Sequence, residues 1–413
     1  MTEHIEGSDE QSPVREILAD PNFRAFWIAQ VLYSAANGTL RFTFVWLVVT
    51  LTDWSAAEAL VAIALGLPAM FLSVPAGAWS DRVNRKHLFI QWTSVTCLAL
   101  GLFTLAIAAE VVTTAWTAVA ALVIGIAITI NMPNVGAMVP LLVPKERLMN
   151  AIAIQNGGSQ AASFVGLAGG GLAISLFGDA GGFGLLTMVM FAALLLMLRV
   201  TIPSDARGHT GPPSGMFESI KEGARFGFSS DPLRTMLLLA MILGSSFSVM
   251  QISMPRVVEE TYGKGAGFAG IVLGAFGMGM LISSIFVARR QSMPHGRNVA
   301  MFIGIGLGMG QFLVSFAPNA PVAILVMMAW GINAGVAIAS HRTLAQTHTP
   351  PEMMGRIMGL LMLGFSGGLP IGAAASGLLV PWLGGVNTMR IVGVITMCLT
   401  IPLTWRRKIL NLT

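Results

Sequence analysis

The sequence predicts an all-α integral membrane protein, with twelve transmembrane helices in two pseudo-symmetric six-helix bundles. Three observations predict this fold. Only 10% of the 413 residues are charged and 54% are hydrophobic, whereas soluble chains are roughly a quarter charged. Apolar runs of the roughly 20 residues that a bilayer requires recur along the whole chain. Most basic residues fall on alternate connections between these runs, as the positive-inside rule describes for the cytoplasmic side.

The chain begins with a polar segment, residues 1–22, that is rich in acidic side chains. A signal peptide would start basic and then turn apolar, and this segment does neither. We interpret it as an acidic cytoplasmic tail that is disordered or lies on the surface. Its acidic residues are Glu3, Glu6, Asp9, Glu10, Glu16 and Asp20.

Six apolar runs predict the N-terminal bundle, residues 23–201, and six more predict the C-terminal bundle, residues 234–405. The predicted spans are 23–50, 56–77, 88–109, 114–137, 149–176, 182–199, 234–258, 265–287, 298–317, 321–341, 357–381 and 384–405. The segment 202–233 has the Pro- and Gly-rich start of a linker, and 217–228 is predicted as an amphipathic helix on the inner membrane face. Residues 406–413 form a short cytoplasmic tail.

The distribution of basic residues predicts the orientation of the chain. With the N-terminus in the cytoplasm, 20 of the 24 Lys and Arg residues fall at or near cytoplasmic ends. We therefore expect a bacterial inner-membrane protein with both termini inside. This sidedness argues against a nucleic-acid partner, despite an isoelectric point near 9.7. Cys97 and Cys398 lie inside apolar runs, so we interpret them as core residues without a disulfide.

An internal repeat links the two predicted bundles. The segment VPKERLMNAIA at 143–153 aligns with TPPEMMGRIMG at 349–359, an offset of 206 residues, or about half the chain. Repeats of this kind are typical of transporters whose binding site lies between the two halves.

A charged loop between the second and third spans stands out in a chain with so few charges. It carries Gly77, Asp81, Arg82, Arg85 and Lys86. A glycine lets two helices approach closely, and a carboxylate there can accept hydrogen bonds from a neighbouring helix N-terminus.

This loop resembles the signature of the major facilitator superfamily, with Asn84 where the family usually has a second glycine. We expect Asn84 to serve because asparagine also tolerates a left-handed backbone. The resemblance implies a latch that ties the two halves together on the cytoplasmic side and breaks when the transporter opens inward. It extends from Phe23 to Arg407.

Within that superfamily the chain resembles the bacterial drug and siderophore exporters, which include enterobactin and macrolide exporters. Three stretches carry the resemblance: DPNFRAFWIAQVLYSAANG, NMPNVGAMVPLLVPKERLMNAIAIQN and SFVGLAGGGLA. The last resembles a Gly-rich antiporter motif, although Leu167 stands where the motif has proline. The resemblance implies a monomeric secondary transporter that exports amphiphilic small molecules by alternating access, with protons as the expected driving ion.

A polar stripe on the first span is the first candidate for a substrate site. It consists of Gln30, Ser34, Asn37 and Arg41, with Tyr33 alongside, at helical spacing. Polar groups are costly in lipid, so the stripe is expected to face a cavity or another helix. Arg41 is a functional candidate for the same reason, although it could instead pair with Asp53 or Glu58 near the outer interface.

The same reasoning selects polar residues on other spans, for which hydrogen bonding between helices is an equally good explanation. These candidates are Asn131, Asn134, Gln155, Asn156, Ser159, Ser248, Gln251 and Asn333.

The candidates for proton coupling are Asp53 and Glu58, with Arg41 as the expected partner. A second hypothesis is an importer or facilitator of a small organic anion that uses Arg41 and Arg256 as ligands. The sequence contains no HExxH, CxxC or P-loop motif, so we expect no enzyme activity, metal, cofactor or ATP-driven pumping.

Overall fold

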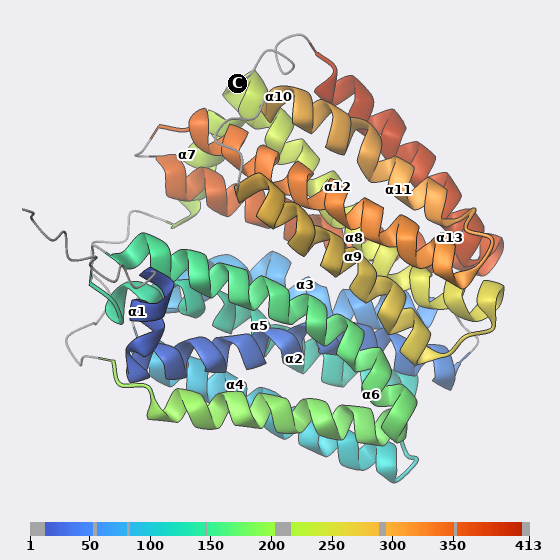
Figure 1. The fold of residues 1–413 in the computed structure, drawn as a ribbon, viewed down its shortest axis with the longest axis horizontal. Helices are drawn as coiled ribbons and strands as arrows, with labels where there is room; N and C mark the ends of the chain where they lie inside the picture. Colours follow the sequence, from blue (N-terminus) through green and yellow to red (C-terminus); the bar gives the residue numbers. More distant parts are fainter. Residues whose placement is uncertain are drawn as a thin grey trace, which may run out of the picture.

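The computed structural model describes residues 13–52, 56–80, 83–144, 147–202, 216–288, 295–350 and 353–406. Every regular element in these ranges is a helix (Figure 1). The elements are α1 (Pro13–Ala19), α2 (Pro21–Leu51), α3 (Ala56–Ser80), α4 (Arg85–Ala108), α5 (Thr114–Met138), η1 (Val139–Leu141), α6 (Leu148–Arg199), α7 (Met216–Ser229), α8 (Asp231–Tyr262), α9 (Ala266–Ala288), α10 (His295–Asn298), η3 (Val299–Ile305), α11 (Gly306–Val314), α12 (Ala320–Thr347) and α13 (Met354–Thr404).

The long helices confirm the predicted membrane fold. Among the described residues, eight helices are long and apolar enough to cross a membrane. Two of them, α6 and α13, each supply two spans, because Gly178 (φ 68°) and Gly384 (φ 74°) interrupt them. Glycine adopts this left-handed backbone without a steric penalty, so the chain turns back there. Figure 1 shows the two segments of α6 running in opposite directions from this turn.

Local sequence signals set several helix starts. Asp20, Thr113 and Asn319 each cap a helix with a side-chain oxygen that accepts a backbone N–H two or three residues later. Proline follows at the first or second position of α2 and α12, where its missing N–H costs nothing. These caps explain why the predicted starts of these spans lie within a few residues of the observed ones.

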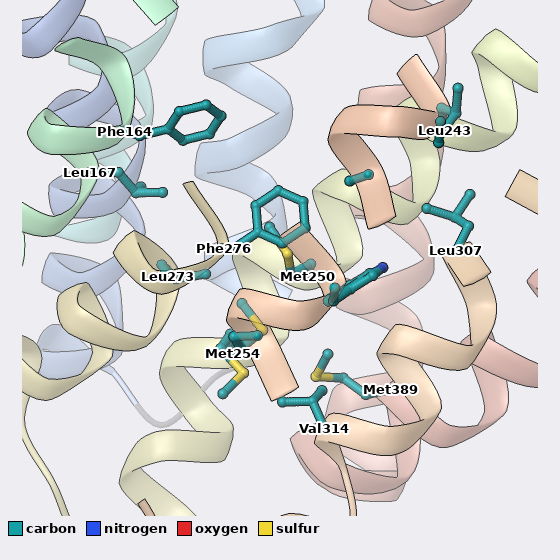
Figure 2. Close-up of a cluster of buried hydrophobic side chains, with 14 of the residues drawn as sticks. Phe164, Leu167, Leu243, Met250, Met254, Leu273, Phe276, Leu307, Val314 and Met389 are labelled. Atoms are coloured by element: carbon teal, nitrogen blue, oxygen red, sulfur yellow. The ribbon is translucent and has the colours of Figure 1, made fainter. Parts of the chain in front are cut away.

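Two hydrophobic clusters form the cores of the bundles. The N-terminal cluster is built around the stacked and edge-on rings of Phe44, Phe103 and Phe183. The C-terminal cluster also includes side chains from the N-terminal half, and Figure 2 shows two of these, on α6, facing Phe276 and Leu273 of α9. The two bundles are therefore packed together over a shared apolar face. The N-terminal residues in it are Phe42, Trp46, Phe164, Leu167 and Ile174.

Two short helices pack on the bundles at the end where the chain starts and finishes. In α1, Ile17 is buried and Glu16 forms an ion pair of 3.0 Å with Arg147, so part of the predicted tail is a packed helix. The segment 217–228, predicted as an amphipathic helix, lies within the helix α7. Its Gly223 and Gly227 pack against residues of α13 and α8.

Candidate functional site

The contact between α6 and α9 closes one end of the interface between the bundles. We define the terminal end as the end where α1 and the finish of α13 lie, and the distal end as the opposite one, where α6 and α13 turn back. On α6, Phe164, Ala168 and Gly171 face Gly277, Gly274 and Gly270 of α9. Small residues let the helix backbones approach closely, so this end is tightly packed.

The same face of α6 is uncovered toward the terminal end. One and two turns before Phe164 lie Gln160 and Asn156, and both are exposed. In Figure 1 the two bundles converge where α6 meets α9 and diverge on the other side. Because exposed amides are costly in lipid, we conclude that these two side chains face the space between the bundles.

The polar stripe of α2 turns partly into the N-terminal bundle. Tyr33 packs its ring 5.0 Å from that of Phe89 on α4. Its hydroxyl lies next to the amides of Asn131 and Asn37, yet no hydrogen bond of good geometry reaches it within the described residues. The Asn131 amide donates to Thr93 Oγ1 at 3.1 Å. The fold thus brings α2, α4 and α5 together around one buried polar cluster.

This cluster leaves an unusual number of buried polar atoms without a partner. Within the described part of the chain, these are Tyr33 OH, Asn37 Oδ1 and Asn131 Oδ1, and one turn earlier on α2 the same holds for Gln30 Nε2 and Oε1. Buried polar atoms in proteins are nearly always hydrogen-bonded to protein or water. The cluster can therefore bind a small polar group of a ligand, or water molecules that a ligand displaces.

Arg41 lies one turn further along α2 and is half-buried. In the described chain it has neither a hydrogen bond nor an ion pair. Ser34, on the same stripe, accepts a hydrogen bond from Ser163 of α6 through its carbonyl at 3.2 Å.

Most of the remaining candidates bond within their own bundle. Gln155 is buried and its amide donates to Ser159 Oγ at 3.3 Å. Asn134 donates to Ile130 O of its own helix, and Asn333 donates to Phe302 O of η3. On α8, Ser248 is buried and Gln251 half-buried.

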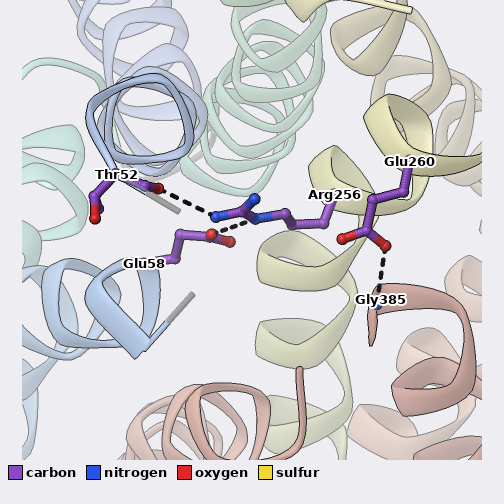
Figure 3. Close-up of polar contacts among 5 residues, drawn as sticks. All are labelled: Thr52, Glu58, Arg256, Glu260 and Gly385. Atoms are coloured by element: carbon purple, nitrogen blue, oxygen red, sulfur yellow. Dashed lines mark hydrogen bonds and ion pairs between the residues drawn. The ribbon is translucent and has the colours of Figure 1, made fainter. Parts of the chain in front are cut away.

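At the distal end an ion pair joins the two bundles (Figure 3). Arg256 Nε on α8 lies 2.6 Å from Glu58 Oε1 on α3, and its Nη2 donates to Thr52 O at 3.4 Å. The Glu58 side chain is fully buried and that of Arg256 is 12% exposed. The expectation that Arg41 pairs with Glu58 is therefore wrong, because Arg256 occupies that carboxylate. The second coupling candidate, Asp53, lies outside the described residues.

The predicted latch loop is described only in part. Asp81 and Arg82 lie outside the described residues, Gly77 belongs to α3, and Arg85 is half-buried. Lys86 donates to Leu198 O at the end of α6, at 3.0 Å. This contact is within the N-terminal bundle.

The explanation expected for Asn84 is wrong. Its backbone is extended (φ −66°, ψ 113°), and its side chain caps α4 by accepting from Lys86 N and His87 N. This loop position therefore requires an N-cap residue and not a residue with a left-handed backbone.

Sequence reasoning missed several buried polar residues. Thr93 receives the Asn131 amide, Gln311 donates to Ser246 O at 3.0 Å, and a ring nitrogen of His341 lies 2.8 Å from Met236 O. Gln311 is an isolated polar residue in an apolar run, so the sequence gives no signal for it. Thr93 and His341 have polar neighbours in their own spans, and these neighbours are the signal that could have indicated them.

Comparisons with known proteins agree with this architecture. Residues 12–411 match the family described as transmembrane secretion effector. The chain is 25% identical to the multidrug efflux pump Tap of Mycobacterium tuberculosis over 381 residues, covering 84% of each protein. It is 24% identical over 373 residues to the enterobactin exporter EntS of Escherichia coli, covering 89% of this chain and 86% of the exporter.

Solved structures support the fold alone. The crystal structure of the nucleoside transporter NupG superposes with a TM-score of 0.70 at 17% identity, covering 93% of this chain and 98% of the transporter. A POT family transporter in complex with 5-aminolevulinic acid gives a TM-score of 0.68 at 13% identity, covering 94% and 96%.

Proposed function

Because the chain belongs to the transmembrane secretion effector family of the major facilitator superfamily, we propose that it exports amphiphilic small molecules by alternating access. It is a multi-pass membrane transporter and not an enzyme. Drug-like compounds and siderophores are the proposed substrates. The names of the two relatives support this class. We place it as a monomer in the bacterial inner membrane with both termini in the cytoplasm, so that the terminal end is the cytoplasmic one.

One observation carries the proposal. The face of α6 that packs on α9 at the distal end continues into the exposed amides of Gln160 and Asn156 at the terminal end. An exporter takes up its substrate in a state that is open to the cytoplasm and closed to the outside, and a polar entrance on the cytoplasmic side fits that state. Rocking of the bundles would then expose the bound molecule to the outside.

The polar cluster of Gln30, Tyr33, Asn37 and Asn131 is the proposed contact for neutral hydrogen-bonding groups. Arg41 is the proposed contact for an acidic group such as a carboxylate or phenolate, because a guanidinium binds such oxygens well. The anion-import alternative loses support, since Arg256, one of its two ligands, is already paired with Glu58.

Proton coupling is part of the proposal, with Glu58 as the group that exchanges the proton. Its carboxylate is buried and its Oε2 has no partner within the described residues. We expect Glu58→Gln to abolish accumulation driven by a proton gradient while substrate counterflow continues, because counterflow needs no net proton movement. Accumulation that persists in Glu58→Gln would remove Glu58 from the coupling step.

Transport in everted inner-membrane vesicles tests the direction. We expect energised vesicles with the protein to accumulate ethidium or enterobactin, and an uncoupler to stop the uptake. The double variant Asn156→Leu/Gln160→Leu should lower the rate, whereas Gln346→Leu, which changes an exposed amide on α12, should not. Uptake by intact cells with none in everted vesicles would show an importer.

A further inference from the structure

We propose that Arg256 is a gating residue that holds the distal end closed by binding the N-terminal bundle at two points. The two points are Glu58 Oε1 and Thr52 O. The inference rests on the proposed alternating access, and it is tested by closure of the distal end alone, without measuring movement of substrate or protons.

The α2–α3 connection is electrostatically suited to receive Arg256. Thr52 is the C-cap of α2, where carbonyl groups lack helical partners and the helix dipole is negative. Glu58 lies in the first turn of α3, where the dipole favours a carboxylate. One arginine thus binds the end of one helix and an acid at the start of the next (Figure 3).

The tip of α8 is held to the rest of the C-terminal bundle by separate contacts. Glu260 Oε2 accepts from Gly385 N–H of α13 at 3.4 Å, and the Tyr262 hydroxyl donates to Ala317 O at 2.9 Å. Pro255, inside α8, leaves the Gln251 carbonyl without its helical donor, so the helix is weakened just before Arg256. The tip therefore belongs to the C-terminal bundle, and Arg256 is its charged link to the other half.

The acidic residues near Glu58 make its ion pair with Arg256 important for closure. Glu259 and Glu260 lie near enough to Glu58 to act on it electrostatically. Without Arg256, the buried Glu58 carboxylate would lose its counter-ion while the exposed Glu259 and Glu260 still act on it. Removing one member of a buried pair leaves the other charge uncompensated, which favours separation and hydration. Outward opening therefore requires that Arg256 leave Glu58, and closure that it return.

A disulfide across the distal end can report the closure without any transport assay. A Cβ built on Gly267 of α9 lies 2.9 Å from Ser175 Cβ of α6, which is shorter than the roughly 3.5–4.5 Å found in disulfides. The two helices must therefore shift slightly apart to hold this pair, and every variant is compared in the same reporter background. The reporter is Ser175→Cys/Gly267→Cys in a background without the native thiols (Cys97→Ala, Cys398→Ala). Disulfide formation with copper phenanthroline in native membranes measures how often the end is closed.

We expect the reporter to cross-link rapidly, and Arg256→Gln and Glu58→Gln each to slow it about tenfold or more. The exchange Glu58→Arg/Arg256→Glu should restore the rate to at least about threefold above either single variant, because the pair is re-formed. The matched control is Arg390→Gln. Arg390 is another distal arginine, but its partners among the described residues are Ser315, Asn387 and the Phe316 ring, all in the C-terminal bundle, so its loss should leave the rate unchanged.

The proposal is overturned if Arg256→Gln cross-links at the parental rate, if Arg390→Gln slows it equally, or if the exchange recovers nothing. Each variant is checked for a single symmetric peak in size-exclusion chromatography. Glu58→Gln serves as the test if Arg256→Gln does not fold. If Arg256 controls closure but the protein exports neither ethidium nor enterobactin, the proposed function is contradicted and this inference stands.

Discussion

Gly270 of α9 lies against Gly171 of α6 so closely that a Cβ built on Gly270 would lie 2.9 Å from Gly171 Cα and 2.9 Å from Ala168 O. The bundles thus meet at the distal end through backbone atoms. This is how membrane helices gain van der Waals contact where no hydrophobic effect drives their association. Closure of this end depends on the absence of side chains at both glycines.

The first prediction is that Gly270→Ala opens the distal end. The added methyl group must push the backbone of α6 away, which costs the closed state about 1–3 kcal/mol. We expect slower cross-linking of the Ser175→Cys/Gly267→Cys reporter and slower ethidium efflux. Gly265→Ala is the control, because a Cβ there meets nothing within 4 Å. Equal efflux in the two variants would contradict the role of this contact.

The second prediction uses the only two tyrosines of the chain. Tyr33→Phe removes a hydroxyl without a partner in the described chain, so the free energy of unfolding should change by less than about 0.5 kcal/mol. The set of exported compounds should change, because this hydroxyl is proposed to contact substrate. Thermal unfolding and an efflux panel measure the two effects.

Tyr262→Phe should behave in the opposite way. Its hydroxyl donates to Ala317 O at 2.9 Å, so its loss should cost about 1 kcal/mol of stability and leave the efflux panel as it was. If Tyr33→Phe lowers stability and leaves the panel unchanged, the buried cluster is structural and not a substrate site.

The third prediction concerns the cap of α4. Asn84→Ala removes the oxygen that accepts from Lys86 N and His87 N, and should cost about 1 kcal/mol of stability. Asn84→Gly should cost only a few tenths of that, because glycine is a fair N-cap. A glycine variant more stable than the parent protein would instead indicate a left-handed backbone. The midpoint of thermal unfolding in detergent distinguishes the two.

The fourth prediction is the sidedness of the chain. Reporter tags inserted after Phe228 and after His295 should both be cytoplasmic, because basic residues concentrate on these connections. Alkaline phosphatase and green fluorescent protein fusions give opposite signals on the two sides of the membrane. Activity of the phosphatase at either position would place the entrance between the bundles on the outside and reverse the proposed direction.

The sequence by itself determined the spans and many of their ends. Whether a run of about 20 apolar residues forms a helix depends on the run alone, because in lipid each backbone group must bond within its own segment. Cap residues such as Asp20 and Asn319 act over two or three positions. Gly178 and Gly384 also act locally, because each allows the turn at which a predicted span ends.

The tertiary structure alone decided which polar residues meet. Gln30, Tyr33 and Asn37 could be assigned to one face of one helix, but the approach of Tyr33 to Asn131 depends on how α2 and α5 pack. Arg41 was the nearest basic residue in sequence to Glu58, and it proved to be the wrong partner. Arg256 lies 198 positions away, on the other bundle. Helix periodicity shows which way a side chain points on its own helix, but the partner it meets depends on how the two bundles pack against each other.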